Sequence, residues 1–364
     1  MTPRERFVAL LDGQVPDRLP LLADLSYWYS ARQDERSLDA RYQGDEGYLR
    51  LHEDLGCVFY YDYAGGGVLG ESLEDVDQES FAQGPETVHR VRTRAGELTG
   101  RTRYLPDSHC RACTEYMVKR PEDLRAVRAF CESRRFSPRF DEYLKRRESI
   151  GQRGLPSALL PRSPLPALLV EWAGVEMTTY LSVDARPEFE MTLQCMDAAL
   201  DPAYEIACRS PAPLFHFTDN LSSEIVGGLY ARYLAPFHRK RIRQFHDCRK
   251  KAAVHLDGTI RGLLGPLAAT GVDAVESLTT APVGDLALEN LRAEAGDDRV
   301  VLWGGLPGAL FSVPYGKVHV QRQVEAIRRI FGRGGRFIPG TADQVPPDAD
   351  IELVRLASEK LAAG

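Results

Sequence analysis

His255 and Asp257 have the residue types and the spacing that acid–base or metal chemistry requires. They lie at the end of an apolar run, and residues two apart on a β-strand point their side chains to the same face. An imidazole beside a carboxylate can bind a divalent metal, or it can act as a general base that the acid orients. The same pair could instead be a hydrogen-bonded pair that closes the top of a core. The local sequence leaves these interpretations open.

Other polar residues also come within or just after apolar runs. Charged side chains are seldom buried unless they are paired or functional, so their recurrence at such positions indicates a shared site. A tyrosine at the end of the second run could donate a proton there. His216, inside an apolar run, is interpreted as a hydrogen-bonded core histidine. The residues at the ends of runs are Tyr63, Asp219, Asn220, Glu276, Trp303, Asp343 and Gln344.

The elements that must position these residues are short apolar runs that alternate with amphipathic helical stretches. Alternation of this kind predicts a parallel sheet, and eight repeats in 364 residues favour an α/β fold of one closed (β/α)8 TIM barrel. No GxGxxG follows a strand, so a dinucleotide-binding sheet has no support. In a TIM barrel the active site lies at the carboxyl ends of the strands. The predicted strands are 19–25, 57–63, 157–161, 214–220, 252–258, 274–278, 300–305 and 336–340.

One segment departs from this alternation. Residues 89–104 alternate polar and apolar side chains around Ala95-Gly96-Glu97, which is typical of a β-hairpin. We expect an antiparallel β-hairpin insertion after the second barrel strand, over about residues 85–118. No change in composition marks a linker, so residues 1–364 are predicted to form a single domain.

The composition excludes some classes of function. Lys and Arg number 46 against 52 Asp and Glu, a net charge of −6, whereas a nucleic-acid surface needs a net basic footprint. No apolar run approaches the roughly 18 residues of a membrane span, and the charged N-terminus lacks a signal-peptide core, so a cytoplasmic protein is expected. The seven cysteines are scattered, and Cys110 and Cys113 form a CxxC without the second pair that a structural zinc needs.

Six short segments, spread along the chain, share their sequence and order with a known family. They are TPRERF at 2–7, PDRLP at 16–20, LAPF at 234–237, HLDG at 255–258, GVDA at 271–274 and PPD with DIE at 346–352. With these segments the chain resembles the uroporphyrinogen decarboxylase superfamily, which also contains methylcorrinoid:thiol methyltransferases. The resemblance implies a (β/α)8 barrel whose site lies at the carboxyl mouth, and it suggests a homodimer.

The chain departs from the decarboxylase branch after the first strand. Where that branch carries Arg-Gln-Ala-Gly-Arg to bind carboxylates, residues 26–33 read SYWYSARQ, with one arginine and three aromatic residues. Aromatic rings supply apolar and stacking surface rather than carboxylate clamps, so uroporphyrinogen itself is not the expected substrate. The predicted substrate-binding residues are Tyr27, Trp28, Asn220, Trp303 and Gln344.

The chain also departs from the methyltransferase branch, which binds zinc through His-x-Cys and a later Cys. The resemblance places His255, Asp257 and Asp343 at these positions, so both thiolates have become carboxylates. They are the predicted metal ligands, with zinc as the first choice and manganese or iron as alternatives, and Glu276 is a fourth ligand or a supporting partner. Without a metal, the two carboxylates would repel, and one should hold a proton near neutral pH.

The leading functional hypothesis is a metal-assisted enzyme that transfers a methyl or other alkyl group of a small or mid-sized organic substrate. A corrinoid carried by a partner protein is a further cofactor that the resemblance allows. The first alternative is a decarboxylase of a carboxylic acid. The second is a non-catalytic barrel that binds a corrinoid or tetrapyrrole. The predicted catalytic residues are Tyr63, Asp219, His255, Asp257 and Glu276.

Overall fold

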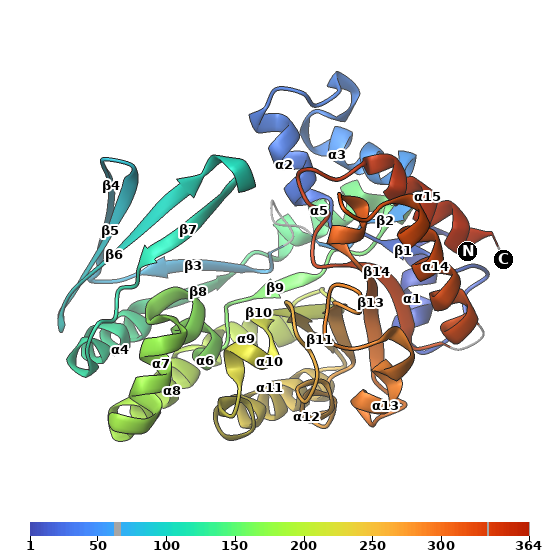
Figure 1. The fold of residues 1–364 in the computed structure, drawn as a ribbon. Coiled ribbons are helices and arrows are strands. Elements are labelled where there is room, and N and C mark those ends of the chain that lie inside the picture. The colour runs from blue at the N-terminus through green and yellow to red at the C-terminus, as the bar shows by residue number, and fades with distance from the viewer. Residues whose placement is uncertain (62–66, 333–334, 364) are drawn as a thin grey trace. The chain divides into compact units, whose positions relative to one another are not determined.

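The computed structural model describes residues 1–61, 67–332 and 335–363 (Figure 1). The chain divides into two compact units. Unit 1 comprises Met1–Gly67, Asp141–Leu160 and Pro211–Gly364, and unit 2 comprises Val68–Phe140 and Pro161–Ser210. Unit 2 is therefore formed by two segments that interrupt unit 1 in the sequence.

Unit 1 is built on an eight-stranded sheet in the order β2–β1–β14–β13–β12–β11–β10–β9, in which every neighbouring pair is parallel. Each of the eight predicted runs overlaps one of these strands, although β1 and β2 are much shorter than predicted. The strands are β1 Leu21–Leu22, β2 Cys57–Val58, β9 Ala158–Leu160, β10 Leu214–Leu221, β11 Lys251–Leu256, β12 Ala274–Leu278, β13 Val301–Pro307 and β14 Phe337–Ala342.

The sheet curls so that its two edges meet. The backbone N–H groups of Leu155 and Ser157, just before β9, donate to the carbonyls of Phe59 and Tyr60, just after β2, at 3.1 and 2.9 Å. These bonds satisfy backbone groups that an open edge would leave without partners. The curled parallel sheet is consistent with a (β/α)8 barrel.

Helices follow the strands of unit 1 and pack by apolar stripes. On α14, Val320, Val324, Ile327 and Phe331 repeat at helical spacing and are buried. The α-helices are α1 Pro3–Leu11, α2 Ser26–Asp34, α3 Gly44–Asp54, α5 Phe140–Ile150, α10 Ser223–Val226, α11 Ala235–Asp247, α12 Leu264–Ala268, α13 Leu291–Ala295, α14 Lys317–Phe331 and α15 Ile351–Ala362. Short 3-10 or π turns are η1 Ala40–Tyr42, η4 Gly151–Arg153, η6 Tyr230–Leu234, η7 Leu288–Asn290 and η8 Gly308–Phe311.

The interior of the curled sheet is filled around Trp303. This side chain is fully buried, and its ring lies 5.1 Å from the ring of Phe7 and 4.6 Å from that of Tyr60. Small residues on neighbouring strands leave room for the indole. A Cβ at Gly340 would lie 2.8 Å from Trp303 Nε1 and 3.1 Å from the carbonyl of Leu22, so glycine allows this packing.

Unit 2 contains a four-stranded antiparallel sheet in the order β4–β5–β6–β7, and β3 pairs with β8. The predicted hairpin is present as β5 and β6, with the turn between Thr93 and Gly96. The strands are β3 Leu69–Leu73, β4 Asp77–Gln83, β5 Glu86–Thr93, β6 Gly96–Leu105, β7 Cys110–Glu115 and β8 Arg134–Pro138. The helices are η2 Pro106–Ser108, η3 Pro121–Asp123, α4 Leu124–Ser133, α6 Pro164–Ala167, η5 Leu168–Trp172, α7 Gly174–Asp184, α8 Arg186–Ala199 and α9 Asp201–Arg209.

Unit 2 is larger than the predicted insertion at 85–118. The helices of its second segment were not assigned to it, because an amphipathic helix has the same local pattern whichever sheet or helix covers its apolar face. Cys110 and Cys113 are both exposed on β7, and residues three apart on a strand point to opposite faces, so the CxxC is not a facing thiol pair.

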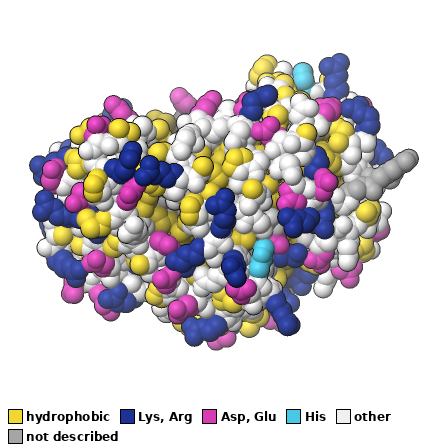
Figure 2. All heavy atoms as spheres, turned by 90° about the horizontal axis from the view of Figure 1, so that it is seen from below, with side chains coloured by type: hydrophobic (Ala, Val, Ile, Leu, Met, Phe, Trp, Pro, Cys, Tyr) yellow, Lys and Arg dark blue, Asp and Glu magenta, His cyan; other side chains and the backbone are white. Residues whose placement is uncertain are grey.

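The surface mixes charges of both signs. On the face drawn in Figure 2, Lys and Arg side chains are interspersed with Asp and Glu. Among the described helices, none combines the length and the apolar character that crossing a membrane would require.

Candidate functional site

A buried histidine–carboxylate pair lies at the carboxyl ends of β11 and β12. The register of these parallel strands pairs His255 directly with Glu276, so their side chains are neighbours on the inner face. His255 Nδ1 lies 2.5 Å from Glu276 Oε2, and the two residues are 5% and 1% exposed. Strand register therefore brings together two residues that lie on separate apolar runs of the sequence.

Glu276 has two further neighbours in the interior. The hydroxyl of Tyr60 donates to Glu276 Oε1 at 3.0 Å, and His216 Nε2 lies 3.7 Å from Oε2. His216 is fully buried, with its ring 5.6 Å from that of Tyr61. Neither ring nitrogen of His216 has a hydrogen-bond partner within the described chain, so the interpretation of a hydrogen-bonded core histidine is wrong. Strand alternation turns this side chain inward, beside Glu276.

The other side of His255 faces Asp343, just after β14. His255 Nε2 lies 3.4 Å from Asp343 Oδ1, and the Asp343 side chain keeps 39% of its surface exposed. Asp24, buried after β1, accepts hydrogen bonds from the N–H and hydroxyl of Ser26 at 2.9 and 2.5 Å. The side-chain amide of Gln344 donates to Asp24 at 3.2 Å, which joins the ends of β1 and β14.

Electrostatics make His255 and Glu276 an ion pair. Burial alone would lower the pKa of His255, but the charge and hydrogen bond of Glu276, helped by Asp343 and Asp257, raise it to about 9. Burial likewise opposes ionisation of Glu276, but the charge and hydrogen bond of His255 lower its pKa below the usual value. At neutral pH the imidazole therefore carries protons on both nitrogens.

Burial is the main cause of the pKa shifts of the other ionisable groups in the cluster. Burial raises the pKa of Asp343 to about 7; the charge of His255 opposes this shift, and the charges of Asp257, Glu276 and Asp24 add to it. Burial also raises the pKa of Asp24, despite its hydrogen bonds, and lowers that of His216 to about 4. Burial and the charge of Glu276 raise the pKa of Tyr60.

This geometry can hold and release a proton. An imidazolium is fixed on one nitrogen by a buried carboxylate, and its other N–H points toward a partly exposed carboxyl group. A group with a pKa near neutral pH is suited to general acid–base work.

Of the predicted site residues, the structure brings together His255, Glu276 and Asp343, and Gln344 joins them through Asp24. Asp257 lies one residue beyond the end of β11 and is exposed, so it does not share a strand face with His255. Its charge still acts on His255 and Asp343.

Asp219 lies on the outer side of β10, away from this cluster. His238 Nε2 of α11 and Asp219 Oδ2 are 2.9 Å apart, and His238 Nδ1 is 3.3 Å from the hydroxyl of Tyr230. Phe217, two residues earlier, packs its ring against the same histidine at 5.3 Å. Strand alternation thus turns Asp219 toward the helices, while His216 points inward.

The other predicted residues are spread over several places. Trp303 was expected at the end of its strand, but β13 continues to Pro307, and this leaves the indole inside the core. Trp28 is half-buried on α2 and donates from Nε1 to the carbonyl of Ala349 at 3.2 Å. Tyr27 is half-buried on the same helix, and Asn220 is half-buried in β10 with φ of +50°. Tyr63 lies outside the described residues.

The donor set does not fit a shared metal shell. Within residues 1–61, 67–332 and 335–363, no three His, Cys, Asp or Glu side chains have an arrangement that could hold a metal ion. Glu276 occupies one nitrogen of His255, and Asp257 is exposed. The metal assignment of His255, Asp257 and Asp343 stays a prediction, and no chemical step below depends on it.

Asp24, Ser26 and Tyr60 were not among the predicted site residues. Asp24 and Ser26 follow the first apolar run, so the strand-end rule that selected Asp343 could have found them. His216 is two residues after Leu214 on β10, so the two side chains point to the same face, and Leu214 packs in the inner core. This spacing was the sequence signal that His216 points inward.

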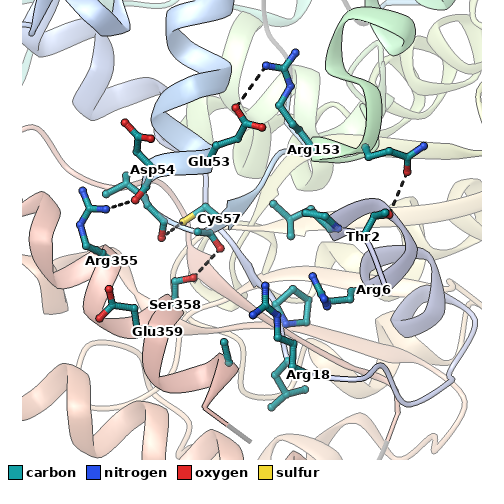
Figure 3. A pocket seen from close by; sticks show the side chains of 18 residues that line it. Thr2, Arg6, Arg18, Glu53, Asp54, Cys57, Arg153, Arg355, Ser358 and Glu359 are labelled. Atoms are coloured by element: carbon teal, nitrogen blue, oxygen red, sulfur yellow. Dashed lines mark hydrogen bonds and ion pairs between the residues drawn. The ribbon is translucent and has the colours of Figure 1, made fainter.

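A cavity of about 470 Å³ lies elsewhere in unit 1, beside Cys57 and Val58 at the start of β2 (Figure 3). Arg153 lies 3.7 Å from Glu53 across it, and burial raises the pKa of Cys57 to about 12, so the thiol is unreactive. The charged lining is thus partly paired, and the cavity is at the amino ends of the strands, where barrels carry stability rather than catalysis.

Comparison with known proteins identifies the fold and not the family. No family model and no curated protein matches the chain. Among solved structures, a methyltransferase from Methanosarcina mazei aligns with a TM-score of 0.61 over 99% of this chain and 98% of its own, at 12% identity. The chain shares that fold. At this identity the likeness carries no further conclusion.

Two other solved structures align less well. A glycoside hydrolase family 20 β-N-acetylglucosaminidase covers 62% of this chain and 54% of its own, at 13% identity and a TM-score of 0.34. The GH18 chitinase ChiB of Flavobacterium johnsoniae covers 63% and 82%, at 11% identity and a TM-score of 0.34. Neither likeness enters the functional argument.

Proposed function

We propose that the chain is an enzyme that transfers a methyl group of a small or mid-sized organic substrate, on a closed (β/α)8 barrel of the uroporphyrinogen decarboxylase type. The observation that carries this proposal is the buried His255–Glu276 pair, with the partly exposed Asp343 beside the other nitrogen of the imidazole. The fold shared with a methyltransferase supports it.

The cluster would manage the proton that accompanies the transfer. When a methyl group leaves an oxygen or nitrogen atom, the electron pair of the broken bond stays on that atom, and the alkoxide or amine that results can bind a proton. His255 holds a proton on Nε2, on the side of Asp343, while Glu276 fixes Nδ1. Asp343, partly exposed and with a pKa of about 7, returns the proton from solvent. Tyr60 holds Glu276 in place.

The methyl acceptor is proposed to be the corrinoid of a partner protein, and the chain is proposed to form a homodimer. These parts rest on the resemblance. The roles of His255, Glu276 and Asp343 are assigned without them.

The two alternatives have less support. A decarboxylase of this type would need inward cations to bind carboxylates, but Lys and Arg are absent from the hydrogen-bond and ion-pair partners that the described chain gives Asp24, Glu276 and Asp343. A binding-only barrel would have its cluster paired off internally. Asp343 keeps 39% of its side-chain surface exposed, so a ligand can reach the carboxyl group beside His255 Nε2.

The test is a screen of O-methyl and N-methyl compounds carrying an isotopically labelled methyl group, with reduced corrinoid as the acceptor. His255→Asn should lower turnover by about a hundredfold or more, the usual contribution of a general acid. Asp219→Asn, which alters the buried pair on the outer side of β10, is the matched control and should keep most of the activity. Full turnover in the His255 variant would contradict the proposal.

A further inference from the structure

We propose that the ligand of this cluster is a small organic cation, a methylated ammonium compound. The inference rests on the proposed function and names its substrate class. It starts from the imbalance of charge and of hydrogen-bonding groups around His255.

Carboxyl groups outnumber cations in the cluster. Asp24, Glu276 and Asp343 reach it from the ends of three strands, and Asp257, one residue beyond the end of β11, is a fourth carboxyl group close to His255 in the chain. The only positive group that contacts these carboxyls within the described residues is His255. A site with this balance attracts a cation and repels an anion.

His216 is an independent sign of an unfilled site. It is fully buried beside Glu276, and neither of its ring nitrogens has a hydrogen-bond partner within the described chain. A buried polar group without a partner is costly, so it commonly marks a functional position. His216 Nε2 faces Glu276 Oε2 at 3.7 Å, which leaves Nδ1 as a further polar atom that a ligand could use.

Aromatic rings lie beside His216 and His255. The ring of Tyr61 lies 5.6 Å from that of His216 and 6.5 Å from that of His255, and the Tyr60 ring lies 5.7 Å from Tyr61. Ring faces attract ammonium groups, and quaternary ammonium groups most typically. Carboxylates, a further polar atom and aromatic faces together suit an organic cation.

A bare metal ion suits the same groups less well. Zinc needs three or four donors at about 2.0–2.3 Å, whereas Glu276 already contacts one nitrogen of His255, Asp257 is exposed, and the described chain contains no three-donor group. An organic ammonium spreads its charge over a larger radius and needs no fixed coordination. It also suits methyl transfer: the C–N bond breaks, the methyl carbon bonds to the nucleophilic acceptor, and the electron pair stays on nitrogen as a neutral amine.

The experiment compares choline with 3,3-dimethylbutan-1-ol, a neutral molecule of the same shape, by calorimetric titration in buffer with a chelator. Choline should bind about tenfold more tightly than the alcohol, as charge and cation–π contacts predict. The Asp343→Asn and Asp257→Asn variants should each bind choline several-fold more weakly, and their affinity for the alcohol should be unchanged. Asp247→Asn, an exposed carboxylate at the end of α11, is the control and should alter neither.

The inference would be overturned if the two molecules bind with equal affinity, or if choline does not bind. It would also be overturned if both carboxylate variants bind choline as tightly as the parent protein. Displacement of choline by stoichiometric zinc would overturn it too. Methyl transfer from a neutral ether without choline binding would overturn the inference and keep the proposed function. Carboxylate-dependent choline binding without any methyl transfer would keep the inference and overturn the proposed function.

Discussion

Replacing Glu276 with Gln should return His255 to the neutral form at pH 7. Glu276 Oε2 lies 2.5 Å from His255 Nδ1, and its charge and hydrogen bond overcome a burial effect that by itself lowers the pKa of the imidazole. In the variant, only Asp343 and Asp257 oppose burial. We expect the pKa of His255 to fall from about 9 to about 6.5 or lower, which is a loss of about 300-fold in proton affinity or about 3 kcal/mol.

The assay is a nuclear magnetic resonance titration of protein with labelled histidine. The chain has eight histidines, and His255→Asn assigns the relevant signal. Asp219→Asn changes the other buried His–Asp pair and should leave the titration of His255 unchanged. A His255 pKa that stays near 9 in Glu276→Gln would refute the reasoning, because the exposed carboxylates would then be the groups that hold the proton.

The same pair sets a dependence of stability on pH. The folded-state pKa of His255 lies above its unfolded value of 6.5, so its contribution is fully present below pH 6.5 and is lost as pH rises through about 9. The free energy of unfolding, measured with urea, should therefore fall across this range by up to about 3 kcal/mol more in the parent protein than in Glu276→Gln.

Three further changes test the surroundings of the pair. Tyr60→Phe removes the donor to Glu276 and should lower the free energy of unfolding by about 1–2 kcal/mol; an unchanged urea midpoint would show that the hydroxyl does not stabilise the carboxylate. Gly340→Ala brings a methyl group against the Trp303 indole and should lower the free energy of unfolding, measured by a thermal melt, by about 1–3 kcal/mol. In the control Gly228→Ala the new methyl group meets no neighbouring atom, so the free energy of unfolding should change little. Asp343→Asn should remove the inflection near pH 7 from the rate of methyl transfer, and a retained inflection would assign it to another group.

Much of the architecture followed from local pattern. Eight apolar runs predicted eight strands because a strand buried on both faces must be continuously apolar, and the run at 274–278 matches β12 residue for residue. The hairpin of β5 and β6 followed from alternation around a turn. The strand-end rule selected His255, Glu276 and Asp343, since parallel strands bring their carboxyl ends to one edge.

Tertiary structure alone decided which side chains meet. A continuously apolar strand does not reveal which of its faces is inner, so His216 and Asp219 could not be assigned to the interior and to the helix layer before the sheet had closed. The end of β11 at Leu256 excluded Asp257 from the strand face of His255, and the extent of β13 placed Trp303 in the core. Register set His255 opposite Glu276, and register depends on contacts between strands far apart in the chain.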